Sequence, residues 1–160
     1  MSITYRPIGV VRSPFSEPQG VPIQPSRGRG IRARVELLPE LADGLADLDG
    51  FSHIILLCHL HRSQGYSLRV VPFLDHVPRG VFATRAPRRP NSIGLSVVRL
   101  LSIDGATIHF EGVDLLDGTP VLDIKPYVPE FDNREEIRLG WLERVRCRSA
   151  VSDGRFSADE

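Results

Sequence analysis

The spacing of apolar and polar residues along this chain predicts a protein built mainly from β-strands. Between residues 31 and 37, Ile31, Ala33, Val35 and Leu37 alternate with charged side chains. A period of two is expected for a strand with one face toward a core and the other toward solvent. Asp-Gly pairs at 104–105 and 117–118 favour tight hairpin turns. Similar alternation predicts further strands over 4–12, 51–62, 68–72, 81–85, 93–103, 107–111 and 121–128.

Helical patterns are few. They cover 39–47 and 133–145, the second through Ile137, Trp141 and Val145 at intervals of four. Two short helices cannot provide the crossover connections that so many parallel strands need. We therefore predict a mostly β fold, a small closed or nearly closed antiparallel β-barrel with one or two short helices. This domain spans 1–148 and includes an irregular loop at 13–30, and a mobile tail follows at 149–160.

Composition narrows the range of partners. Of 160 residues, 41% are hydrophobic and 25% are charged, and no apolar run approaches the roughly 20 residues that span a bilayer. We expect no membrane partner. The start lacks a signal-peptide pattern and two cysteines are few for a secreted domain, which predicts a cytoplasmic location. Twenty basic residues balance twenty acidic ones, so any nucleic-acid binding has to be local.

A proline-rich loop at 80–95 carries three arginines. Arg85, Arg88 and Arg89 lie around Pro87 and Pro90. Proline restricts the backbone, and guanidinium groups held on a stiff loop suit a phosphate or a carboxylate. The alternative is an arginine-rich loop that is simply solvated. The loop by itself leaves both interpretations open.

Histidines gather on one face of the strand expected at 51–62. Alternation places His53, His59 and His61 together, with Cys58 on the opposite, apolar face. One strand supplies too few ligands for a metal ion and no carboxylate or thiolate partner stands nearby, so we predict no metal site. Histidines that are hydrogen-bonded along a cleft wall are the favoured interpretation. Cys58 is expected to be plain core.

The strand expected at 121–128 places a carboxylate, an ammonium and a phenol on one face, from Asp123, Lys125 and Tyr127. Pro126 cannot donate a ladder hydrogen bond, which predicts an edge or bulged strand that a ligand or second subunit can approach. An exposed ion pair worth under about 1 kcal/mol is the alternative. The chain has no Gly-x-Gly-x-x-Gly, Walker or Gly-x-Ser-x-Gly motif, so the common nucleotide-binding and hydrolase sites are unsupported.

Five sequence blocks occupy residues 8–15, 50–53, 80–85, 89–94 and 114–127, and the last reads Asp-Leu-Leu-Asp-Gly-Thr-Pro-Val-Leu-Asp-Ile-Lys-Pro-Tyr. In this order they resemble the TsaA-like (YaeB) family. The resemblance implies a small β-barrel methyltransferase that uses S-adenosyl-L-methionine and works as a homodimer. It also implies the substrate, which is N6 of threonylcarbamoyladenosine at position 37 of tRNA.

Cofactor contacts carry over from the family by resemblance. The chain departs from the family pattern at Ile23, Arg62 and Ser92, where an arginine, a glutamine and a proline are usual. Ile23 removes a charged side chain beside the cofactor, so contacts there fall to the backbone and to Gln24. The implied cofactor-binding residues are Pro22, Ile23, Gln24, His61, Arg62, Arg85, Leu95, Leu115, Leu116, Asp117 and Gly118.

Strand alternation supplies the candidate catalytic residues. The N6 group is a weak nucleophile whose proton must leave, so Asp123 or Tyr127 is the candidate acceptor and Lys125 the candidate partner for the threonyl carboxylate. Larger family members carry a C-terminal domain that helps to hold tRNA, and this sequence ends without one. Two alternatives therefore stay open: a regulatory module that binds S-adenosylmethionine without methyl transfer, and methyl transfer to another small substrate. A purely structural barrel explains neither the arginine loop nor the aligned polar set.

Overall fold

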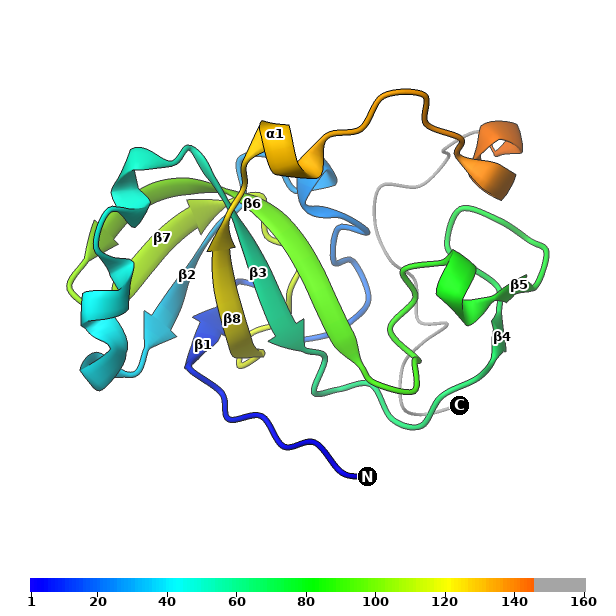
Figure 1. The fold of residues 1–160 in the computed structure, drawn as a ribbon. Coiled ribbons are helices and arrows are strands. Elements are labelled where there is room, and N and C mark those ends of the chain that lie inside the picture. The colour runs from blue at the N-terminus through cyan, green and yellow to red at the C-terminus, as the bar shows by residue number, and fades with distance from the viewer. Residues whose placement is uncertain (146–160) are drawn as a thin grey trace.

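The computed structural model describes residues 1–145, and its centre is a six-stranded antiparallel barrel (Figure 1). The strand order is β1-β2-β7-β6-β3-β8, and pairing of β8 with β1 closes the barrel. The predicted mostly β fold is confirmed. The barrel strands are β1 (Gly9–Arg12), β2 (Arg32–Leu37), β3 (His53–His59), β6 (Ile93–Asp104), β7 (Thr107–Glu111) and β8 (Pro120–Pro126).

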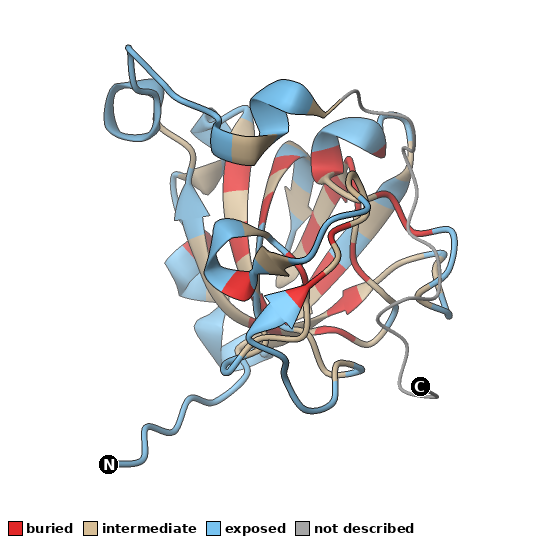
Figure 2. Cartoon of the chain, turned by 90° about the vertical axis from the view of Figure 1, so that its right-hand side faces the viewer, coloured by how far each residue is buried: buried red, intermediate tan, exposed pale blue. Residues whose placement is uncertain are grey.

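Alternation along the strands builds the core. In β3 the residues Ile54, Leu56 and Cys58 are fully buried, whereas their neighbours are at least partly exposed. Phe110 of β7 and Val35 of β2 fill the same interior, which appears as the red segments inside the barrel in Figure 2. Burying each such side chain contributes roughly 1.5–3 kcal/mol. The faces predicted for the 51–62 strand are confirmed for its buried half.

Two backbone details set the register of the barrel. The tight β6–β7 hairpin turns at Gly105 and Ala106, between the paired residues Asp104 and Thr107, with Gly105 at a φ of 56°. At Gly9 the backbone of β1 comes so close to β2 that a Cβ would lie 2.6 Å from the carbonyl oxygen of Glu36. Glycine is the residue that permits this approach.

Strand β8 is neither a simple edge nor a fully paired strand. Its pairing with β1 covers Pro120 and Val121, whereas its pairing with β3 extends to Pro126. The register with β3 shifts between Leu57 and Cys58. The bulge expected for this strand is the register shift against β3. The open edge is also present, because the second half of β8 pairs on one side only.

A small flap lies beside the barrel. It contains the two-stranded sheet of β4 (Arg69–Val70) and β5 (Arg79–Gly80), followed by the 3₁₀ helix η4 (Val81–Ala83). The predicted strand at 81–85 is wrong. The backbone N–H and the hydroxyl of Thr84 both donate to the carbonyl of Val81, which closes a helical turn and leaves no ladder to pair.

The predicted helix at 133–145 is also wrong. The short α1 (Pro129–Asp132) ends before it, and a 3₁₀ helix, η5 (Gly140–Arg144), covers only its last part. Ile137 is 63% exposed and Leu139 is 57% exposed, so the apolar pattern has no core to pack against. The predicted helix at 39–47 is a 3₁₀ helix, η2 (Pro39–Leu45). The other 3₁₀ helices are η1 (Pro25–Arg27) and η3 (Leu48–Gly50).

The predicted tail at 149–160 and the last residues of the predicted domain lie outside the described residues. Among residues 1–145, no helix has the length and apolar character needed to cross a membrane.

Candidate functional site

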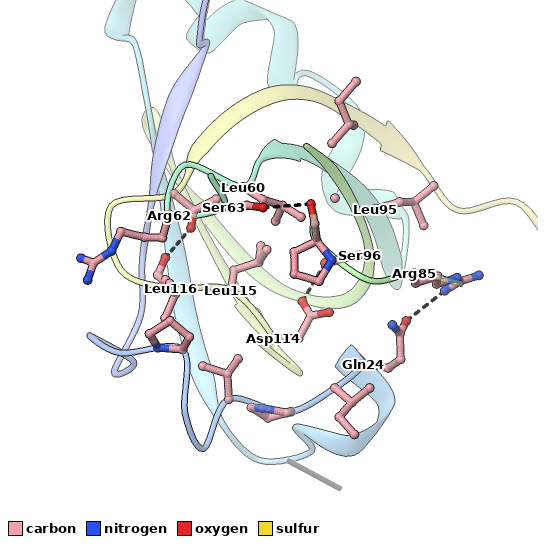
Figure 3. A pocket seen from close by; sticks show the side chains of 18 of the residues that line it. Gln24, Leu60, Arg62, Ser63, Arg85, Leu95, Ser96, Asp114, Leu115 and Leu116 are labelled. Atoms are coloured by element: carbon pink, nitrogen blue, oxygen red, sulfur yellow. Dashed lines mark hydrogen bonds between the residues drawn. The ribbon is translucent and has the colours of Figure 1, made fainter. Parts of the chain in front are cut away.

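A cavity of about 360 Å³ opens beside the barrel where several connections meet. This volume lies within the range of small-molecule sites. Its walls come from the β1–β2 loop, the turn after β3, the proline-arginine loop, the start of β6 and the β7–β8 connection (Figure 3). The lining includes Pro22, Ile23, Gln24, Leu60, His61, Arg62, Ser63, Thr84, Arg85, Arg89, Ile93, Leu95, Ser96, Asp114, Leu115 and Leu116.

Asp114 supplies the single carboxylate of this lining within residues 1–145. The hydroxyl of Ser96, itself buried, donates a 2.6 Å hydrogen bond to Asp114 Oδ1. Loss of water raises the pKa of Asp114 to about 7, although the hydrogen bond from Ser96 and the charge of Arg85 act in the opposite direction. The cavity therefore contains an acid that changes its charge near neutral pH.

The three arginines of the proline-rich loop have different contacts, and that of Arg88 is a long one, 3.5 Å from its Nε to the carbonyl oxygen of Gln64. Arg85 lines the cavity and donates to Gln24 Oε1 at 2.9 Å, which joins two walls of the site. Nη1 of Arg89 donates to the backbone carbonyls of Val81, Thr84 and Ala86, with the shortest distance 2.8 Å to Thr84. Arg89 thus stabilises the loop itself, and Arg85 is the guanidinium that the loop presents to a ligand.

His61 lies in the cavity wall just beyond the end of β3. Burial lowers the pKa of His61, and the nearby charges of Arg62 and His59 lower it further. His61 therefore gives up its proton at a lower pH than an ordinary histidine. Among residues 1–145, no three histidine, cysteine, aspartate or glutamate side chains form a group able to hold a metal ion.

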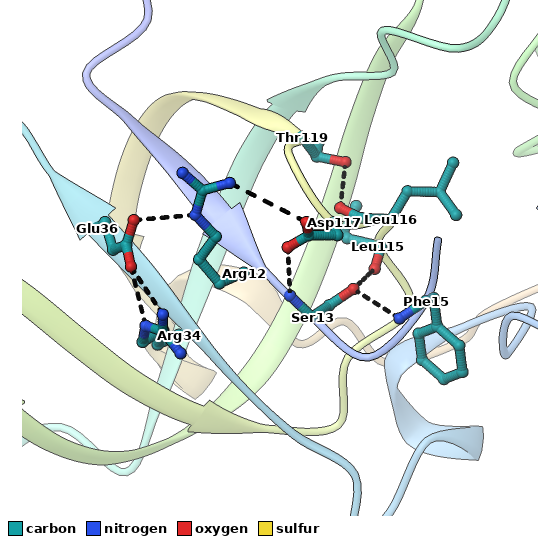
Figure 4. A network of polar contacts seen from close by, with 9 residues as sticks. All are labelled: Arg12, Ser13, Phe15, Arg34, Glu36, Leu115, Leu116, Asp117 and Thr119. Atoms are coloured by element: carbon teal, nitrogen blue, oxygen red, sulfur yellow. Dashed lines mark hydrogen bonds and ion pairs between the residues drawn. The ribbon is translucent and has the colours of Figure 1, made fainter. Parts of the chain in front are cut away.

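The β7–β8 connection is held in place by the end of β1 (Figure 4). The Ser13 hydroxyl donates to the carbonyl of Leu115 at 2.7 Å, and the Ser13 N–H donates to Asp117 Oδ1 at 3.1 Å. The N–H of Gly118 donates to the carbonyl of Val11. These bonds fix the segment that carries Asp114 and Leu115 into the cavity.

Comparison with known proteins places the chain in a family. A family model described as the tRNA-methyltransferase O N-terminal domain matches residues 10–133. The chain belongs to this family. The resemblance drawn from the five sequence blocks is thereby confirmed.

Relatives and solved structures agree with this assignment. A probable S-adenosyl-L-methionine-binding protein of Pyrococcus abyssi is 54% identical, over 98% of this chain and 86% of its own. The human tRNA (adenine(37)-N6)-methyltransferase is 37% identical over 85% of this chain, which spans 32% of the human protein. The crystal structure of TrmO from Pseudomonas aeruginosa matches with a TM-score of 0.75 at 42% identity, over 88% of this chain and 63% of that one.

Nine of the eleven predicted cofactor contacts lie in the cavity lining, and they come from five separate segments. The remaining two, Asp117 and Gly118, are outside the lining and belong to the hydrogen bonds that hold the β7–β8 connection. The nine are Pro22, Ile23, Gln24, His61, Arg62, Arg85, Leu95, Leu115 and Leu116.

The predicted catalytic set lies on the outer face of the barrel and does not line the cavity. Lys125 Nζ is 2.8 Å from Asp123 Oδ2, and the Tyr127 hydroxyl donates to Asn133 at 2.7 Å. Asp123 pairs with Leu57, which pairs in turn with Leu95, so Asp123 and the cavity residue Leu95 share one row. Two strand spacings separate them by about 10 Å.

The sequence analysis missed Asp114 and Ser96. Asp114 opens the longest of the five family blocks, but nothing in its local sequence distinguishes it from the other aspartates. Ser96 follows Leu95 in an alternating strand, and its inward position alone marks it as a buried polar residue. A buried hydroxyl on a strand is the one pattern that could have pointed toward a partner at this place.

Proposed function

We propose that this chain is an S-adenosyl-L-methionine-dependent tRNA methyltransferase. The observation that carries the proposal is the cavity, in which nine residues implied by the family resemblance line one space of about 360 Å³. The side chains that line this cavity fit the chemical groups of the cofactor. Apolar residues such as Leu115 suit an adenine ring, Arg85 suits a carboxylate, and Asp114 suits a cation.

The proposed reaction is methylation of N6 of threonylcarbamoyladenosine at position 37 of tRNA, in the cytoplasm. S-adenosylmethionine supplies a methyl group carried on a positively charged sulfur. Catalysis then depends mainly on alignment, which the Arg85–Gln24 bridge and the fixed β7–β8 connection provide. The N6 proton must leave, and we assign its acceptance to Asp123 or Tyr127.

Lys125 is the proposed partner of the threonyl carboxylate. Its ammonium and the Asp123 carboxylate are both substantially exposed, so their ion pair is weak and open to exchange. A substrate carboxylate can replace Asp123 as the ion-pair partner of the Lys125 ammonium, which leaves the Asp123 carboxylate free to accept a proton. Asp123 shares one row with the cavity residue Leu95, about 10 Å away, and this row supports a substrate that extends from the cavity toward the pair.

A homodimer is part of the proposal. The outer face of β3 and β6 carries a patch of apolar residues in register, with Ile93 44% exposed and Leu95 46% exposed. A patch of this kind beside a ligand site favours a second copy of the chain as its cover. The patch consists of Ile55, Leu57, Ile93, Leu95 and Val97.

The test is methyl transfer itself. The purified chain is incubated with labelled S-adenosylmethionine and tRNA that contains threonylcarbamoyladenosine, and the digested nucleosides are analysed by mass spectrometry. We expect label in that nucleoside, with the rate strongly reduced in Asp123→Ala and Lys125→Ala while cofactor binding is unchanged. Parental rates in both variants would refute the roles given to β8.

A second candidate is a module that binds S-adenosylmethionine without transferring methyl. The separation between the β8 polar set and the cavity favours it. The same experiment distinguishes the two, because such a module binds the cofactor and leaves every nucleoside unlabelled.

A further inference from the structure

The presence of a carboxylate, Asp114, in the wall of the cavity requires an explanation. It is the one carboxylate of the lining within the described residues, and its charged neighbours in that wall are arginines. The buried Ser96 hydroxyl fixes its orientation through a 2.6 Å hydrogen bond (Figure 3). A carboxylate removed from water is costly to keep, and it is best compensated by a positive charge nearby.

The side chains around Asp114 do not supply a full counter-charge. The charge of Arg85 acts on Asp114, but the Arg85 guanidinium already donates to Gln24. The guanidinium of Arg89 is directed at three backbone carbonyls of its own loop. Burial raises the pKa of the Cys58 thiol, and the negative charge of Asp114 raises it further.

We propose that Asp114 is the anionic group by which the cavity selects S-adenosylmethionine, whose sulfur is positively charged, over S-adenosylhomocysteine, whose sulfur is neutral. This inference rests on the proposed function. Both ligands share the adenosine and the amino-acid part, so contacts to those parts cannot separate them. A charge in the wall can, because it interacts with the sulfonium in a partly desolvated space. The consequence for turnover is that the product is released more readily than the cofactor.

Binding measurements test this without any methyl acceptor. Affinities for S-adenosylmethionine, S-adenosylhomocysteine and sinefungin, which carries an amine in place of the sulfonium, are measured by calorimetry at pH 8. We expect the two cationic ligands to bind about tenfold more tightly than S-adenosylhomocysteine. In Asp114→Asn this preference falls to within about twofold, through loss of affinity for the cationic ligands.

Asp104→Asn is the matched control. It changes the net charge by the same amount at the exposed β6–β7 turn, away from the cavity. Equal weakening of all three ligands in Asp114→Asn, or an unchanged preference, would overturn the inference. Absence of binding by either ligand to the parental chain would refute the proposed function itself, and this inference with it.

A second measurement needs no change at Asp114. The preference of the parental chain for the cationic ligand should fall as Asp114 takes up a proton between pH 8 and pH 6, because its pKa is about 7. His61 is the other lining side chain that can take up a proton as the pH falls, and burial lowers its pKa. The fall should therefore persist in His61→Asn. A preference that is constant with pH in that variant would overturn the inference.

Discussion

Replacement of Asp114 by asparagine should change how the stability of the protein depends on pH. Asparagine keeps an oxygen that can accept the hydrogen bond from Ser96, so the substitution removes the titration and leaves the contact. The pKa of Asp114 is about 7 in the folded chain, against an ordinary value of 3.8. Between these values the unfolded chain has already lost the proton that the folded chain still holds.

The sign and size of the effect follow from this difference. Stability falls with rising pH wherever the unfolded state binds fewer protons, so the contribution of Asp114 is complete below about pH 4 and is lost as pH rises through about 7. A difference of roughly three pKa units corresponds to about 4 kcal/mol. Relative to Asp114→Asn, the parental chain should therefore lose about 4 kcal/mol of unfolding free energy between pH 4 and pH 8.

Urea unfolding followed by circular dichroism at several pH values measures this directly. The quantity of interest is the difference in unfolding free energy between the two chains at each pH, which cancels the contributions of all other groups. Asp104→Asn serves again as the control for removal of one carboxylate at an exposed position. A difference between the parental chain and Asp114→Asn that is flat, or that rises with pH, would refute the assignment of a raised pKa to Asp114.

Three further predictions concern the barrel. Gly9→Ala should lower the unfolding free energy by about 1–3 kcal/mol in urea titrations, because a Cβ would lie 2.6 Å from the Glu36 carbonyl oxygen; unchanged stability would show that the strands separate freely. Phe110→Ala should cost about 3–5 kcal/mol by the same assay, since the ring is fully buried, and a loss under about 1 kcal/mol would contradict that packing. Burial raises the pKa of Cys58 to about 12, so in a Cys147→Ser background the native chain should not react with a thiol reagent at pH 8 until urea unfolds it. Rapid reaction of the native chain would place Cys58 at the surface.

The barrel could be predicted from the sequence because its determinants are local. Alternation in 31–37 and 51–62 fixes which face of a strand enters a core, and Asp104-Gly105 fixes a hairpin, all within a few residues. The failed prediction at 133–145 shows the limit of such patterns. Ile137, Trp141 and Val145 have helical spacing, but Ile137 is 63% exposed in the described fold, and burial stabilises a short helix more than propensity does.

The residues that line the cavity could be predicted only through the family resemblance, because local sequence patterns carry no information about which distant segments meet. Spacing on one strand grouped Asp123, Lys125 and Tyr127, since residues two apart share a face. It could not show that this face lies outside the cavity, because that depends on how loops from distant parts of the chain pack. Asp114 shows the same limit, since an aspartate acquires an unusual pKa only from its burial and from Ser96 and Arg85, which the fold brings beside it.

What the sequence alone determined is the alternation and the turns, and with them a β-barrel and its family. What the tertiary structure decided is the identity of the groups that share the cavity. Secondary structure depends on interactions over a few residues, whereas Asp114 and Ser96 are 18 positions apart and meet only because β6 and the β7–β8 connection close over the same end of the core. Desolvation and charge act through space, so the chemistry of the site appears only once the chain has folded.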